Sequence, residues 1–137
     1  MTDSQQDAIR HILTTWRVVT VVGFNGRDRT KPAYYVPAYL KGQGFTVIPI
    51  GPGLTEGLGR AAYPSLSAAP PEAEVALLFL SPRRVGPAVD EAIATGAKAV
   101  WLPLGVVDET AAARARAAGL WVVMDRCMMV EHKYLDL

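Results

Sequence analysis

A glycine turn followed by three cations is the stretch of this chain best suited to binding an anion. The loop reads GFNGRDRTKP from Gly23 to Pro32. Its two glycines allow tight backbone curvature, so main-chain N–H groups can face a negative charge near the start of a helix. Arg27, Arg29 and Lys31 add three positive charges within five positions. Such a loop can also be a solvated surface, but its place directly after the first buried strand favours phosphate binding.

The spacing of the glycines differs from the common nucleotide-binding signatures. A dinucleotide site has G-x-G-x-x-G after the first strand and an acidic residue at the end of the second strand. This chain has only G-x-x-G, from Gly23 to Gly26, and its second strand ends in VIPIGPG without a carboxylate. The P-loop pattern G-x-x-x-x-G-K-[ST] does not occur in the sequence. A standard NAD site is therefore disfavoured, and the alternative is a regulatory or enzymatic module that binds NAD(P) or another nucleotide in the same crevice.

Side chains that could perform covalent catalysis are few and scattered. The two histidines fall in an expected opening helix (His11) and in an expected polar C-terminal tail (His132), neither beside a suitable partner. Asp108 and Glu109 stand at a helix start, where carboxylates stabilise the N-terminus. Cys127 is expected to pack as a small hydrophobic residue, with a reversible disulfide to a thiol ligand as the alternative. No triad, carboxylate pair or metal-ligand cluster emerges, so we expect a binding protein and not an enzyme.

Apolar segments of two kinds alternate along the chain. Short continuous runs indicate buried strands, and they lie at 18–22, 45–50, 74–80, 98–104 and 120–124. Apolar residues at helical spacing indicate amphipathic helices, and these lie at 3–16, 32–40, 84–96 and 107–119.

Local signals also predict how the helices begin. Side-chain caps are expected at Asp3 or Ser4 for the opening helix, at Ser81 for the third helix and at Asp108 for the fourth. Pro37 lies inside the second helical segment, where proline is expected to delay the start of the helix or to kink it.

Strands and helices in alternation predict an α/β fold with right-handed crossovers. We expect a Rossmann-like, doubly wound sheet of five mainly parallel strands in the order 3-2-1-4-5, with helices on both faces. One domain is expected over 1–137, with the helix in 1–16 packed on the sheet. Ligands bind in such sheets outside the carboxyl ends of the strands, where the order reverses, which this order places between strands 1 and 4. The long loop 51–73 can wall that crevice or form a surface excursion.

Bulk composition argues against several classes of protein. The 137 residues include 14 basic and 13 acidic side chains, whereas a nonspecific nucleic-acid binder has a marked basic excess. No apolar run approaches the ~20 residues of a membrane span, and the polar N-terminus is unlike a secretory signal. The single cysteine excludes an internal disulfide. We therefore expect a cytoplasmic protein with neither nucleic acid nor a membrane as partner.

Four blocks of the sequence carry a resemblance to a known family. They are VVGFNGRDRTKPAYYVPAYLKGQGFTVIPIGPG, YPSL, EAIATGAKAVWLPLGV and AGLWVVMDRCMMVE, and the resemblance extends from about Ile12 to Glu131. Taken together, they resemble the small, single-domain CoA-binding proteins, which are related to the CoA-binding domain of the succinyl-CoA ligase α subunit. The ligase turn GFTGxxG is matched by GFNG, with Asn25 in place of threonine. Pro32 stands where many small relatives have serine, and Leu54 where the ligase has lysine.

The resemblance implies a stand-alone protein that binds coenzyme A (CoA) or acyl-CoA and is not catalytic by itself. The ligase carries its phosphorylated histidine in a second domain that has no counterpart in this sequence. CoA would place its diphosphate and 3′-phosphate at the loop after strand 1, where main-chain N–H groups and cations suit them. A further cation would come from Arg60 or from the first loop. The residues expected to bind CoA are Gly23, Phe24, Asn25, Gly26, Arg27, Asp28, Arg29, Lys31, Pro52, Phe79, Leu80, Ser81 and Gly105.

Overall fold

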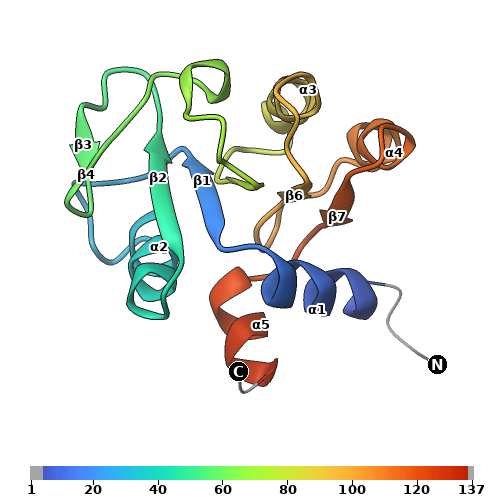
Figure 1. Ribbon diagram of the computed structural model, residues 1–137, viewed down its shortest axis with the longest axis horizontal. Helices are drawn as coiled ribbons and strands as arrows, with labels where there is room; N and C mark the ends of the chain where they lie inside the picture. Colours follow the sequence, from blue (N-terminus) through green and yellow to red (C-terminus); the bar gives the residue numbers. More distant parts are fainter. Residues whose placement is uncertain (1–4, 136–137) are drawn as a thin grey trace.

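Five parallel strands run through the centre of the protein, between two layers of helices (Figure 1). The computed structural model describes residues 5–135. The strands of this sheet, in chain order, are β1 (Val18–Val22), β2 (Thr46–Ile50), β5 (Val75–Leu78), β6 (Ala99–Trp101) and β7 (Trp121–Val123). They fall within the five segments that the sequence predicts, and every pairing in the sheet is parallel. The predicted α/β class is therefore confirmed.

The order of the strands differs from the predicted order. From edge to edge the sheet runs β2-β1-β5-β6-β7, which is 2-1-3-4-5 for strands numbered along the chain, and not 3-2-1-4-5. The third strand, β5, pairs directly with β1, from Val19 opposite Val75 to Val22 opposite Leu78. Alternating hydrophobic segments fit both orders, because the pattern does not record which way the chain turns after the second strand. The order reverses between β1 and β5, so the expected ligand crevice lies there.

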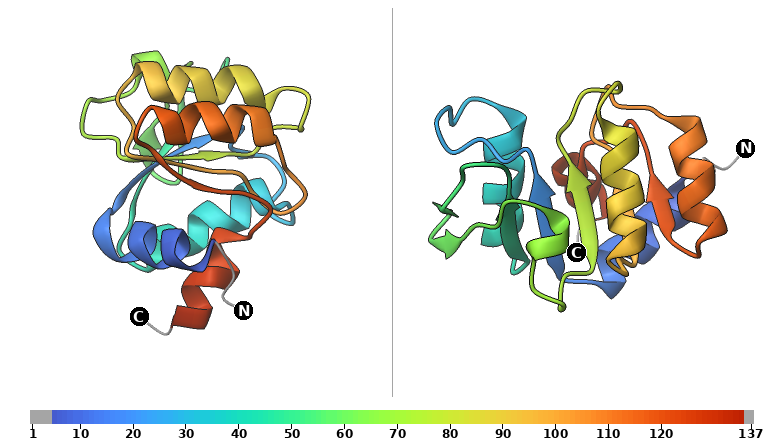
Figure 2. Two further views of the ribbon diagram at one scale, coloured as in Figure 1. Left: turned by 90° about the vertical axis from the view of Figure 1, so that its right-hand side faces the viewer. Right: turned by 90° about the horizontal axis from the view of Figure 1, so that it is seen from above.

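Helices cover both faces of the sheet, as predicted (Figure 2). Alternate residues of a strand point to opposite faces, so Val19 and Val21 join one buried apolar cluster while Ala76 and Leu78 join the other. One face carries α1 (Gln6–Thr15), α2 (Pro32–Gly42) and α5 (Met128–Leu135). The other face carries α3 (Val85–Ala94), α4 (Glu109–Ala117) and the short 3-10 helix η1 (Leu66–Ala68).

The long connection from β2 to β5 folds back onto the protein. It contains a small antiparallel hairpin of β3 (Glu56–Gly57) and β4 (Arg60–Ala61). Leu66 of η1 is then buried in the same apolar cluster as α3 and α4. The short helix η1 thereby covers part of the sheet face where a crossover helix would otherwise lie.

Two helix starts agree with the local sequence signals. Asp108 caps α4, because its carboxylate accepts a hydrogen bond from the N–H of Ala111 at 3.0 Å. Pro37 lies inside α2 but does not delay it, since this helix already begins at Pro32 in its first turn. The caps predicted at Asp3 or Ser4 lie outside the described residues.

Two other helices differ from the predictions. The predicted cap at Ser81 is wrong, because residues 82–84 form a turn and α3 begins only at Val85, without a side-chain cap. The C-terminal helix α5 was not predicted, since its apolar residues Met128–Val130 are consecutive and lack helical spacing. None of the helices between residues 5 and 135 combines the length and the apolar character of a membrane span.

Candidate functional site

The turn after β1 lies against the carboxyl ends of its two neighbouring strands. The N–H of Gly23 donates to the carbonyl of Ile50 at 3.0 Å, and the N–H of Phe79 donates to the carbonyl of Val22 at 2.9 Å. Gly23 has a φ of +81°, and a Cβ at this position would lie 2.2 Å from the carbonyl oxygen of Phe79. The close approach of two backbones therefore requires glycine here, whether or not a ligand is bound.

The loop that follows is held by its own side chains. The amide Oδ1 of Asn25 accepts hydrogen bonds from the N–H groups of Arg27 at 2.9 Å and Asp28 at 3.0 Å. The carboxylate of Asp28 accepts from the N–H of Thr30 at 3.0 Å and from its hydroxyl at 2.6 Å, and these bonds lower the pKa of Asp28. Two main-chain N–H groups that the sequence offers to an anion are thus used inside the loop. The Asn25 Nδ2 has no hydrogen bond within residues 5–135, which leaves it free to donate outward.

The three cations of the loop are exposed. Arg27, Arg29 and Lys31 form no ion pair with any other described residue. The guanidinium of Arg29 lies 5.6 Å from the ring centroid of Tyr34 in α2, a cation–π contact. Asp28 of the same loop offsets part of the charge of Lys31, and the three cations leave the loop with a net positive charge beside the carboxyl end of β1.

A cavity of about 450 Å³ opens at this edge of the sheet, bordered by α2, α5 and the segments that follow β1, β5 and β6. Its lining is mainly apolar, and Lys31 is its charged member. Such a hollow suits the apolar part of a ligand, with polar groups at its margin to fix the orientation. The lining residues are Asn25, Lys31, Pro32, Ala33, Tyr35, Val36, Phe79, Leu80, Pro103, Leu104, Val106, Cys127 and Met128.

The structure brings four of the predicted binding residues together around this cavity: Asn25, Lys31, Phe79 and Leu80. Phe24 is buried instead, in the apolar cluster beneath the loop. Its Cε1 is so near Gly57 of the β3–β4 hairpin that a Cβ on that glycine would lie 2.6 Å away. The other predicted residues do not line the cavity; they are Gly23, Gly26, Arg27, Asp28, Arg29, Pro52, Ser81 and Gly105.

Several lining residues were missed in the sequence. Tyr35 and Val36 carry a recognisable signal, because helical spacing predicts that they share a face of α2. Leu104 adjoins the predicted Gly105. Cys127 and Met128 gave no such signal, since Met128 begins the unpredicted helix α5 and Cys127 directly precedes it. Pro32 also lines the cavity, so the residue that departs from the family pattern is part of the site.

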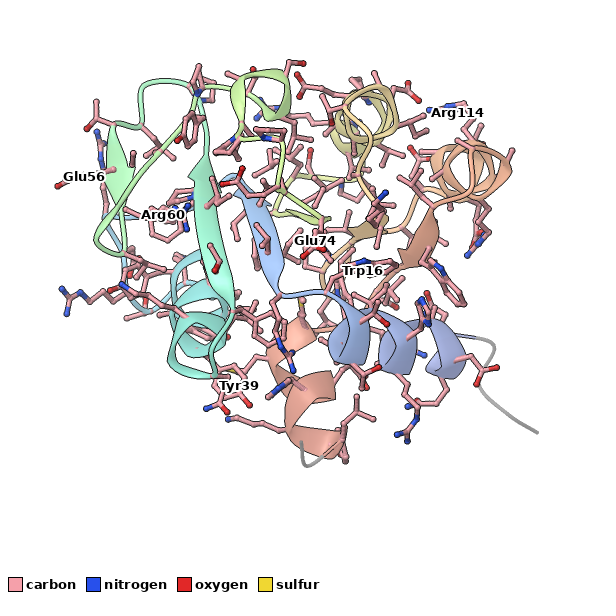
Figure 3. All side chains as sticks on the ribbon, in the orientation of Figure 1. Trp16, Tyr39, Glu56, Arg60, Glu74 and Arg114 are labelled. Atoms are coloured by element: carbon pink, nitrogen blue, oxygen red, sulfur yellow. The ribbon has the colours of Figure 1, made fainter. Side chains whose placement is uncertain are left out.

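Neither histidine borders the cavity. His11 stacks on Trp121 with ring centroids 4.0 Å apart. His132, expected in a polar tail, is buried in α5, and its Nδ1 lies 2.8 Å from the hydroxyl of Tyr39, which points from α2 toward α5 (Figure 3). Burial, and secondarily the charge of Arg17, lowers the pKa of His132. Within the described chain, no group of three or more His, Cys, Asp and Glu side chains is placed to hold a metal ion.

The geometry defines a doubly wound α/β protein whose cavity opens at the switch point of the sheet, the usual ligand position in this class. Residues 17–133 match the family model described as CoA binding domain, and the chain belongs to that family. Over 133 residues it is 29% identical to the uncharacterized protein YneT of Bacillus subtilis, covering 96% of this chain and 97% of that protein.

Solved structures show the same fold. A hypothetical protein from Pyrococcus horikoshii OT3 has a TM-score of 0.89 and 35% identity, with all (100%) of both chains covered. The PH1109 protein redesigned for binding has a TM-score of 0.90 and 37% identity, covering 98% of this chain and 94% of that one. An acetyl-coenzyme A synthetase from Ca. Korarchaeum cryptofilum shares the fold, at a TM-score of 0.73 and 23% identity, over 91% of this chain and 28% of the synthetase.

Proposed function

We propose that this protein binds CoA or acyl-CoA in the crevice between β1 and β5, and that it acts as a stand-alone binding protein without catalysing a reaction by itself. The observation that carries the proposal is the shared cavity. Asn25 and Lys31, from the charged loop after β1, border the same hollow as apolar residues of α2, of α5 and of the segments that follow β5 and β6. Membership of the CoA binding domain family supports CoA as the ligand.

CoA has two chemically different halves that match the two parts of this site. Its nucleotide half carries a diphosphate and a 3′-phosphate, which the exposed cations Arg27, Arg29 and Lys31 can neutralise. The Nδ2 of Asn25 can add a hydrogen bond, because the Oδ1 of the same side chain is already occupied within the loop. The pantetheine half is long and uncharged, and we place it in the mainly apolar cavity.

The side chains around the cavity favour binding over catalysis. Among the described lining residues, Cys127 is the nucleophile and Lys31 the charged group, and neither side chain bonds to a histidine or a carboxylate. Nucleophilic and acid–base catalysis both rely on such a partner. A reversible disulfide between Cys127 and the CoA thiol stays a prediction, and mass spectrometry of protein purified without reductant tests it.

Calorimetric titration with CoA, dephospho-CoA, NAD and ATP tests the proposal. We expect CoA to bind most tightly, and dephospho-CoA to bind more weakly because it lacks the 3′-phosphate. Lys31→Ala removes a cation at the cavity margin and should weaken CoA binding by about 1–3 kcal/mol, the usual range for a charge-assisted hydrogen bond.

Lys98→Ala is the matched control for this substitution. Lys98 is exposed and directly precedes β6, so it lies at the opposite, amino edge of the sheet. The two variants lose the same charge, and only the variant near the crevice should lose affinity. Equal weakening by both would indicate nonspecific electrostatics, and NAD binding as tightly as CoA would overturn the choice of ligand.

The proposal includes a cytoplasmic protein with neither a membrane nor nucleic acid as partner, and the near-balanced charge of the sequence supports the last of these expectations. Cell fractionation tests the location. Binding of labelled DNA or RNA at physiological salt, in competition with CoA, tests the second expectation. An affinity for nucleic acid comparable to that for CoA would contradict it.

A further inference from the structure

A tight turn after β6 forms one wall of the cavity. The N–H of Val106 donates to the carbonyl of Pro103 at 2.9 Å, which closes a four-residue turn. Gly105 occupies the third position with a φ of +85°, a conformation that favours glycine at this place in a type II turn. Pro103, Leu104 and Val106 all line the cavity. The position of this turn therefore sets the shape of the hollow.

Asp125 holds this turn from outside the cavity. Its carboxylate Oδ1 accepts a hydrogen bond from the N–H of Gly105 at 2.7 Å. Asp125 itself has a φ of +57°, in the left-handed region that aspartate and asparagine enter more readily than most residues. It does not line the cavity; it faces the neighbouring hollow beside β7. The hydrogen bond to Gly105 is therefore the contact through which the carboxylate of Asp125 acts on the cavity wall.

The segment that carries Asp125 is itself firmly attached. The indole Nε1 of the buried Trp101 donates to the carbonyl of Arg126 at 2.8 Å. Nη1 of Arg126 donates to the carbonyl of Asp125 at 3.0 Å, and its Nε lies 3.7 Å from a carboxylate oxygen of Glu131 in α5. Asp125 is thus fixed between β6 and α5. Its carboxylate can therefore hold the turn 103–106 in place.

We infer that Asp125 is a positioning residue for the pantetheine half of the ligand, acting by fixing the turn 103–106 as the cavity wall. This inference rests on the proposed function. Without the carboxylate, the Gly105 N–H loses its partner and the turn can move away from the cavity. The nucleotide half, bound at the loop after β1, does not depend on this contact.

Three substitutions separate the carboxylate from the backbone conformation. Asp125→Gly keeps the left-handed backbone available and removes the acceptor. Asp125→Asn keeps both, because its amide oxygen can accept from Gly105. Asp125→Ala removes the acceptor and strains the backbone. Each is titrated with CoA, which has the pantetheine arm, and with 3′,5′-ADP, which carries phosphates but no arm.

We expect Asp125→Gly to weaken CoA binding about tenfold, as for one lost hydrogen bond to a charged group, while 3′,5′-ADP binding changes less than about twofold. Asp125→Asn should retain near-native affinity for both ligands. Equal weakening for CoA and 3′,5′-ADP would show a merely structural role and overturn the inference, and so would unchanged CoA binding in Asp125→Gly. Failure of the native protein to bind CoA at all would instead overturn the proposed function.

Amide hydrogen exchange supplies a readout that needs no ligand. In the native protein and in Asp125→Asn, the Gly105 amide should exchange slowly, and in Asp125→Gly it should exchange at least about tenfold faster, as expected for a freed N–H. Fast exchange of this amide in the native protein would overturn the inference even if a variant failed to fold.

Discussion

The cavity is bordered by two segments that are held in opposite ways. The loop after β1 is held by neighbours in sequence: Asn25 bonds the N–H groups two and three positions on, and Asp28 bonds Thr30. The segment from Asp125 through α5 is held by distant residues. Asp125 bonds Gly105 across 20 positions, and His132 bonds Tyr39 across 93.

The difference indicates how each segment responds to change. A loop held by local bonds can keep its shape when the rest of the protein loosens, and substitutions within it should act locally. A segment held by distant bonds takes its shape from β6, α2 and the core, so it should respond to changes far away in sequence. The loop after β1 carries the charges, whereas the segment from Asp125 through α5 shapes the apolar wall of the cavity.

The substitution Gly23→Ala should have the largest effect on stability, because Gly23 is where the loop after β1 packs against the end of β5. The added Cβ would lie 2.2 Å from the Phe79 carbonyl oxygen, a main-chain atom that cannot swing aside, and φ is +81°. We expect a loss of more than about 3 kcal/mol in the free energy of unfolding, measured by denaturant titration.

Gly26→Ala is the matched control in the same loop. A Cβ there meets only the Phe24 Cε1 at 3.4 Å, and its φ is outside the left-handed region. The expected loss is below about 1 kcal/mol. Similar losses at both glycines would contradict the view that Gly23 is required by the contact with β5.

The sequence predicts the parts of the fold that local patterns encode. Five apolar runs give the strands, and Asp108 and the residues after Pro32 give two helix starts. Strand order was missed because the turn of the chain after β2 depends on how the hairpin and η1 pack, and no run of residues records this. The predicted cap at Ser81 failed for a related reason: Pro82 and two arginines form a separate turn before α3.

The candidate site divides in the same way. Lys31 could be found from the cations of the loop after β1, and Asn25, Phe79 and Leu80 from the family resemblance. Met128 and Cys127 could not, because they reach the cavity through contacts of α5 with α2 and the core. Phe24 shows the reverse error: it belongs to the loop in sequence, yet its side chain is buried in the apolar cluster beneath.

Asn25 offers an intermediate effect that separates the shape of the loop from its charge. Asn25→Ala removes the acceptor for the N–H groups of Arg27 and Asp28 and should lower the free energy of unfolding by about 1 kcal/mol. Asn25→Asp keeps an acceptor but adds a negative charge beside the proposed phosphate position. It should leave stability nearly unchanged and weaken CoA binding by about tenfold or more.

The outcome is read from calorimetry and denaturant titration on the same samples. A variant Asn25→Asp that binds CoA as well as the native protein would place the phosphates away from this loop. A large loss of stability in that variant would show instead that the loop needs the amide, not merely an acceptor.

The smallest expected effect is a dependence of stability on pH, and it concerns the segment from Asp125 through α5. Burial lowers the pKa of His132 in the folded protein below the ordinary value of 6.5. The unfolded chain therefore binds a proton at a higher pH than the folded protein does. The stability linked to His132 is fully present above about pH 6.5 and is lost as the pH falls through the unfolded and then the folded pKa.

Denaturant titrations between pH 8 and 5.5 should therefore show a free energy of unfolding that declines on the acid side, before the carboxylates begin to titrate (about pH 4). His132→Gln should flatten this decline, because the side chain that titrates is gone, whereas His11→Gln, in α1 and stacked on Trp121 away from this junction, should leave it in place. Equal flattening by both variants would contradict the role given to His132. If His132→Gln kept the full slope, the junction of α5 with α2, where His132 meets Tyr39, would not be the acid-sensitive part of the molecule. The segment from Asp125 through α5 would then resemble the loop after β1, in that substitutions in it act only locally.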